Sequence, residues 1–79
     1  MSSMTGETIQ ALLEDAFPGG EITVVDRTGG GDHFHVTVVA NAFDGLPLVQ
    51  QHRLVNGALA APLGDGSIHE LRITTKGTR

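Results

Sequence analysis

Turn-forming stretches rich in glycine, proline and aspartate interrupt this chain at short intervals, so every helix or strand in it must be short. The interruptions are PGG (18–20), RTGGGD (27–32), NAFDGLP (41–47) and PLGDGS (62–67). Glycine takes left-handed backbone angles without strain, and proline cannot continue a helix or a sheet ladder, so each stretch ends a regular element. Five segments remain between these breaks, and their hydrophobic periods differ.

The first segment predicts an amphipathic helix over 8–17. Its apolar residues follow the spacing of a single helical face: Ile9, Leu12, Leu13, Ala16 and Phe17. Ser3 or Thr5 can cap its N-terminus, and Glu7 suits the positive end of the helix dipole.

A second helix is predicted from Leu48 to about residue 63. Pro47 suits a first helical position. At 100° per residue, Leu48, Val55 and Leu59 fall within about 40° of one another, which predicts a buried stripe. His52 lies at the edge of this stripe.

Three strands are predicted, over 21–26, 33–40 and 68–74. The second alternates Phe34, Val36 and Val38 with more polar residues, and the third places Leu71 and Ile73 on one face. The element order is helix, strand, strand, helix, strand. It predicts a single α+β domain over 1–79, with a three-stranded sheet, helices on one face and an ordered core at about 5–75. The final residues, TKGTR, are expected to fray.

Composition excludes several classes of function. The 79 residues include no cysteine, so disulfides, thiolate metal sites and a cysteine nucleophile are excluded for this chain. No catalytic motif is present, and we do not expect an enzyme. The N-terminal sequence lacks the pattern of a signal peptide and no apolar run approaches the roughly 18 residues of a membrane span, which predicts a cytoplasmic protein without a membrane partner. The net charge of −4 makes nucleic acid a weaker expectation.

Histidines are the candidate metal ligands. His33 and His35 stand two apart on a predicted strand, so both point to one side of the sheet, either as a metal-binding pair or as ordinary surface residues. His69 shares the register of Leu71 and Ile73, where an imidazole can be a structural residue, a ligand or a switch. His52 is expected to be structural.

The sequence FDGLPLVQQHRLV (43–55), followed by SIHEL (67–71), resembles the BolA family. The resemblance runs from the first helix to Thr75, and it implies an α+β domain of type II KH-like topology. KH proteins contact nucleic acid through a G-x-x-G loop, and this chain has no glycine pair with that spacing. The BolA family also lacks that loop.

The resemblance implies a role in iron–sulfur cluster and iron handling. BolA proteins pair with a monothiol CGFS glutaredoxin, and a [2Fe-2S] cluster shared with the glutaredoxin cysteine and glutathione bridges the two chains. The BolA ligands match His69 and, in the loop before the second strand, His33, with His35 in reserve. No cofactor is expected for the isolated chain.

The alternative is a DNA-binding transcriptional regulator, because BolA proteins have also been described in that role. The turn at 44–47 before a helix that carries Arg53 is similar to a helix-turn-helix approach. Arg53, Arg72 and Lys76 are the candidate residues for a partner or nucleic-acid surface.

Overall fold

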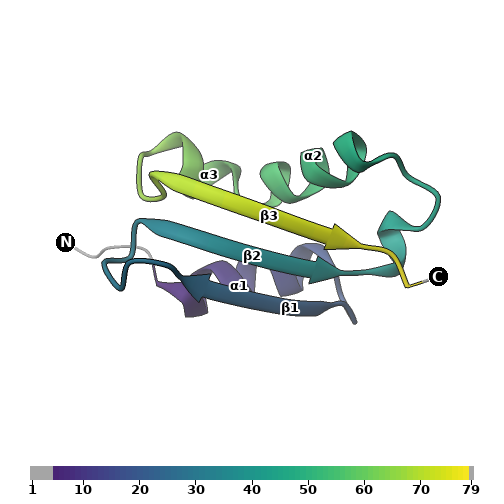
Figure 1. Ribbon diagram of the computed structural model, residues 1–79, viewed down its shortest axis with the longest axis horizontal. Coiled ribbons are helices and arrows are strands. Elements are labelled where there is room, and N and C mark those ends of the chain that lie inside the picture. The colour runs from purple at the N-terminus through teal and green to yellow at the C-terminus, as the bar shows by residue number, and fades with distance from the viewer. Residues whose placement is uncertain (1–4, 79) are drawn as a thin grey trace.

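A computed structural model describes residues 5–78 of the chain (Figure 1). It contains three strands, three α-helices and one 3-10 turn. In chain order these are α1 (Gly6–Ala16), β1 (Glu21–Asp26), β2 (His33–Val39), η1 (Asn41–Phe43), α2 (Leu48–Ala58), α3 (Ala60–Gly64) and β3 (Glu70–Lys76).

The strands form one sheet in the order β1-β2-β3, with β2 at its centre. β1 pairs with β2 antiparallel, whereas β3 pairs with β2 parallel. The parallel pairing requires a crossover, and η1, α2 and α3 provide it. In Figure 1, α1 lies behind β1 and β2, α2 and α3 lie along β3, and none of the described helices crosses the face of the sheet toward the viewer. The predicted α+β architecture, with helices on one face of a three-stranded sheet, is confirmed.

The hydrophobic core lies between the central strand and the helices. Phe34, Val36 and Val38 of β2 are fully buried, and the intervening residues of that strand are partly exposed. This alternation follows from the two-residue period of a strand with one covered face. The helices contribute these buried residues to the core: Ile9, Leu13, Val55 and Leu59.

The first helix begins two residues earlier than the apolar spacing predicts, at Gly6. Thr5 is its N-cap, and the Thr5 hydroxyl accepts a hydrogen bond from the Thr8 backbone N–H at 3.2 Å. Glu7 lies in the first turn, as predicted. The other candidate cap, Ser3, lies outside the described residues.

The first predicted strand, 21–26, has the bounds of β1.

The prediction of one continuous helix from Leu48 to residue 63 is wrong, because the chain breaks at Leu59. Leu59 has φ −107° and ψ 19°, and a new helix starts after it. Pro62 explains the break. Proline has no N–H to donate within a helix, but it is tolerated in a first turn, where the N–H groups have no intrahelical partner. Restarting the helix after Leu59 places Pro62 in that first turn.

Leu48 does not belong to the buried stripe that its spacing predicts. It is 59% exposed, whereas Val55 and Leu59 are fully buried. All three residues share an angular position on the helix, but Leu48 lies in the first turn of α2. Periodicity describes position around a helix axis, and it carries no information on how far along the axis the helix is covered.

The third strand runs over Glu70–Lys76, two residues later than the predicted 68–74. The predicted fraying of TKGTR is wrong for its described part. Thr75 and Lys76 belong to β3, and Lys76 accepts a hydrogen bond from the Ala40 N–H. Thr78 donates its N–H and its hydroxyl to the Asp44 carboxylate, at 2.6 and 2.8 Å. A Cβ at position 77 would overlap that carboxylate, so Gly77 allows the approach.

Candidate metal centre

The candidate site lies where the two parallel strands begin. His33 is the first residue of β2, and its register partner Glu70 is the first residue of β3, with His69 directly before it. The His69 and Glu70 N–H groups both donate to the Asp32 carbonyl, at 2.8 and 3.2 Å. Figure 1 shows β2 and β3 beginning side by side at one end of the sheet. The parallel arrangement therefore joins two histidines there that are distant in sequence.

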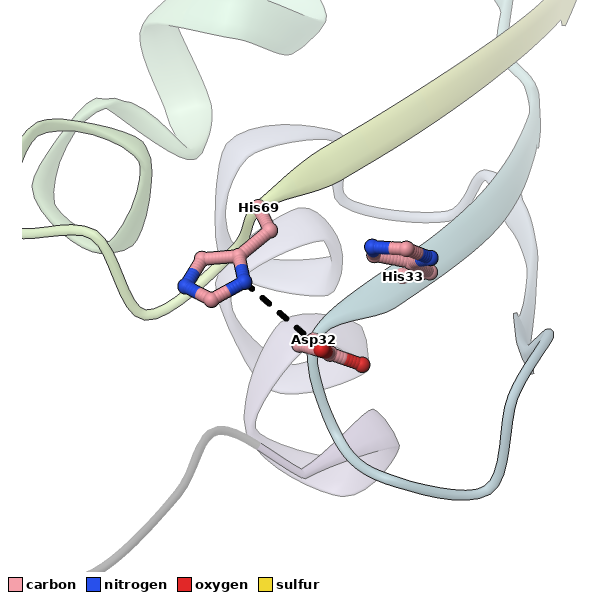
Figure 2. A group of neighbouring side chains, drawn as sticks. All are labelled: Asp32, His33 and His69. Carbon is pink, nitrogen blue, oxygen red and sulfur yellow. Dashed lines mark ion pairs between the residues drawn. The ribbon is translucent and has the colours of Figure 1, made fainter.

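Three side chains meet at this point: Asp32, His33 and His69 (Figure 2). One potential ligand atom from each lies within 4.8 Å of the other two. The His33 and His69 rings are 6.4 Å apart between centroids and inclined at 59°. The His69 Nδ1 lies 3.6 Å from the Asp32 Oδ2. We call this group the Asp-His-His cluster.

The cluster is accessible from outside the molecule. The His69 side chain is 65% exposed and the Asp32 side chain 39% exposed, while His33 is partly buried. The register of Leu71 and Ile73 predicts that His69 lies on the core face. The structure differs, because His69 precedes the strand and turns toward Asp32. An accessible pair of imidazoles, of which His69 is exposed and His33 partly buried, can bind a metal ion that a second protein also contacts.

Asp32 is held in position by the loop before β2. The Thr28 hydroxyl donates to its Oδ1 at 3.0 Å, and this hydrogen bond is the largest influence that lowers the pKa of Asp32 below 3.8. The neighbouring imidazoles His33 and His69 lower that pKa further. Asp32 is therefore a carboxylate at neutral pH, which is the form that binds metal.

The glycine-rich loop folds around a second carboxylate, that of Asp26. It accepts backbone N–H groups from Thr28, Gly29 and Gly31, at 3.3, 2.9 and 2.9 Å. Gly29 and Gly31 have φ of 76° and 78°, which L side chains rarely adopt, so the expected left-handed angles are found at these two positions. The loop thereby delivers Asp32 and His33 to the start of β2.

His35 is not part of the cluster. It lies on the same face of β2 as His33, as predicted, but its Nε2 is 2.9 Å from the Thr74 hydroxyl, with which it forms a hydrogen bond. His52 is partly buried on α2, and it is also outside the cluster. Of the two loop candidates, the structure thus brings His33, rather than the reserve His35, to His69.

Sequence reasoning missed Asp32 as a member of the cluster. The signal was present, because an aspartate directly precedes the first histidine of the HFH sequence. The register between β2 and β3 decides which carboxylate faces His69, and residue spacing does not reveal it.

The three candidate basic residues do not share one surface. Arg72 and Lys76 alternate along β3 with Leu71 and Ile73, which pack against the core, so they lie on the open face of the sheet. Arg53 is exposed on α2, in the helical layer on the other side. Arg72 also lies 3.7 Å from the Glu70 carboxylate, which offsets part of its charge.

The fold and the cluster define a small α+β domain with an exposed histidine, His69, beside a partly buried one, His33, at one end of its sheet. The family model for BolA-like proteins matches residues 16–79. The chain belongs to the BolA-like family. The matched family model describes no catalytic activity.

Curated relatives agree with this family. Protein RP812 of Rickettsia prowazekii is 32% identical, over 92% of this chain and 94% of its own length. The protein named DNA-binding transcriptional regulator BolA in Vibrio cholerae is 37% identical, over 96% of this chain and 77% of its own. Human BolA-like protein 1 is also 37% identical, and this chain spans 54% of its length.

Solved structures confirm the fold. BolA1 of Arabidopsis thaliana superposes with a TM-score of 0.83 at 28% identity, covering 92% of this chain and 90% of that one. The BolA domain of SufE1 from the same plant has a TM-score of 0.83 at 33% identity, covering 92% of this chain and 91% of that one.

Among residues 5–78, none of the helices has the length and apolar character needed to cross a membrane.

Proposed function

We propose that this chain is an adaptor in iron–sulfur cluster and iron handling, and that it shares a [2Fe-2S] cluster with a monothiol CGFS glutaredoxin and glutathione. The observation that carries the proposal is the meeting of His33 and His69 at an exposed end of the sheet. These two histidines are the cluster ligands that the resemblance to the BolA family implies for this chain.

The chain can supply half of the ligands that such a cluster needs. A [2Fe-2S] cluster takes four ligands in addition to its bridging sulfides, and imidazoles can replace thiolates on one iron. His33 and His69 can supply two nitrogen ligands, and the chain has no cysteine to supply the others. A partner must therefore provide the remaining two thiolates, for which the glutaredoxin cysteine and glutathione are suited. Two histidine ligands on one iron raise the reduction potential of such a cluster.

In this proposal, the chain's own residues position the two histidines that would bind the cluster. The loop that Asp26 holds together places His33, and the Asp32 carbonyl fixes the backbone of His69 through the hydrogen bond to its N–H. The exposed imidazole of His69 could bind an iron of a cluster that a docked partner presents.

Anaerobic reconstitution tests the proposal. The chain is mixed with a CGFS glutaredoxin, glutathione, iron and sulfide, and the product is examined by size exclusion and visible circular dichroism. We expect a heterodimer whose spectrum differs from that of the glutaredoxin homodimer. His69→Ala and His33→Ala should each abolish that difference, whereas the matched control His35→Ala should retain it. A spectrum indifferent to both His33 and His69 would refute the proposal.

DNA binding is the second candidate, and the name of the Vibrio cholerae relative favours it. The net charge of −4 and the division of the basic residues between two faces argue against it. Contacts to phosphates give an affinity that falls steeply with salt concentration. Binding to duplex DNA with such a salt dependence, weakened by Arg53→Ala, would support this function. Salt-independent or undetectable binding would reject it.

A further inference from the structure

We propose that Asp32, His33 and His69 form a binding site for one divalent transition-metal ion within the free chain. The three side chains offer two imidazole nitrogens and one carboxylate oxygen. This inference rests on the geometry of the cluster and does not depend on the shared [2Fe-2S] cluster. It adds Asp32 as a ligand and removes the need for a partner protein.

The distances are close to those of a metal site. Bonds of 2.0–2.2 Å from a tetrahedral ion to nitrogen or oxygen place two ligand atoms about 3.3 Å apart. The potential ligand atoms of the cluster already lie within 4.8 Å of one another. The His69 side chain is 65% exposed, so it has room to rotate and close the remaining gap.

The ligands are partly ordered before any ion binds. The Thr28 hydroxyl donates to the Asp32 Oδ1 at 3.0 Å, and the Asp32 Oδ2 faces the His69 ring. The Asp32 carbonyl accepts the His69 N–H at 2.8 Å, which fixes the spacing between the two backbones. Hydrogen bonds of this kind orient metal ligands, and they raise affinity because less freedom is lost on binding.

Neighbouring carboxylates are engaged elsewhere. The Glu70 carboxylate forms an ion pair with Arg27 at 2.8 Å. The Asp26 carboxylate accepts the backbone N–H groups of its own loop. Asp32 is therefore the carboxylate that is placed to complete the site.

The donor set selects the class of metal. Imidazole nitrogens suit zinc, iron, nickel and copper, whereas calcium and magnesium require sites made of oxygen. A set of two histidines and one carboxylate leaves positions on the ion open to water or another ligand. We therefore expect binding of Zn²⁺, Fe²⁺ and Co²⁺, with Ni²⁺ and Cu²⁺ also accepted, and no competition from Mg²⁺.

Metal titration of the free chain tests this site. Tag-free protein, without glutaredoxin or glutathione, is titrated with Co²⁺ by visible absorption and with Zn²⁺ by calorimetry, both in excess Mg²⁺. We expect one ion per chain. His33→Ala and His69→Ala should each weaken binding by about 100-fold or more, and Asp32→Asn by about 10-fold or more, because changing even a group that only supports a metal ligand costs about 10–100-fold in affinity. His35→Ala, on the same sheet face, should bind like the unchanged protein.

Three results would overturn the site: no stoichiometric binding, unchanged affinity in Asp32→Asn, or equal losses in His35→Ala and His69→Ala. Far-ultraviolet circular dichroism of each variant checks that it is folded. Titration of the free chain and reconstitution of the glutaredoxin complex separate this inference from the proposed function. If the free chain binds no metal while the complex forms normally, the metal site is refuted and the adaptor function stands.

Discussion

Leu59→Ala and Leu48→Ala form a matched pair that tests where the core ends. Both leucines occupy the same angular stripe in the sequence, but Leu59 is fully buried and Leu48 is 59% exposed. Truncating a buried leucine removes its transfer free energy and leaves a cavity, which costs about 2–5 kcal/mol. Truncating an exposed leucine should change the free energy of unfolding by about 0.5 kcal/mol or less.

These magnitudes are large compared with the stability of so small a domain. At about 0.05–0.15 kcal/mol per residue, the 79 residues give an expected free energy of unfolding of roughly 4–12 kcal/mol. Leu59→Ala therefore removes a large fraction of the stability. With a urea dependence of about 1 kcal/mol per molar, its unfolding midpoint should fall by about 2 M or more. Leu59→Val, which removes one methylene, should cost about 1 kcal/mol and remain measurable.

Circular dichroism at 222 nm is the appropriate assay, because the chain has neither tryptophan nor tyrosine for fluorescence. Each variant is unfolded in urea at equilibrium, with the unchanged protein measured in parallel. Equal losses of stability for Leu48→Ala and Leu59→Ala would show that the first turn of α2 is buried. That result would refute the reasoning that the core ends before the first turn of α2.

Three further predictions concern local structure. Thr5→Ala should lower the free energy of unfolding by about 0.5–2 kcal/mol, because the cap to the Thr8 N–H is lost; urea unfolding measures this, and Thr5→Ser should restore the cap. Gly66→Ala should destabilise by about 1 kcal/mol, because φ at this position is 85°; no change in the urea midpoint would contradict this. The Ser67 hydrogen bonds lower the pKa of Asp65 below 3.8, so this carboxylate stabilises the fold above about pH 4 and loses its contribution as pH falls through the lowered pKa. Asp65→Asn should therefore reduce the acid-induced fall in the urea midpoint between pH 5 and pH 3, and an identical fall in both proteins would count against this linkage.

Much of the fold follows from local sequence, because local rules set it. Residues 21–26 match β1 since β-branched residues are bounded by turns on both sides, and α1 follows from its apolar spacing and the Thr5 cap. The errors near the C-terminal end of the described chain arise where distant contacts decide. The last strand extends to Lys76 because it pairs with β2, and Thr78 is held by Asp44, which lies far away in sequence.

The candidate site was accessible from the sequence only through resemblance. Residue spacing alone left His33, His35 and His69 as separate possibilities, each with a structural alternative. The β2–β3 register brings His33 to His69, and the Thr74 hydroxyl engages His35. Asp32 was missed because its role depends on that same register, which no local pattern encodes.

The core itself determines the geometry of the Asp-His-His cluster. In a strand, a slip of one residue turns every side chain to the other face, so a strand with one buried face has a strongly specified register. Phe34 and Val36 are fully buried, and they pair with Leu71 and Ile73 across the parallel ladder. Burying Phe34 therefore places its neighbour His33 on the open face, opposite the start of β3. The imidazoles meet because the register that buries Phe34 and Val36 also places His33 beside the start of β3, and the cluster adds its chemistry to that register.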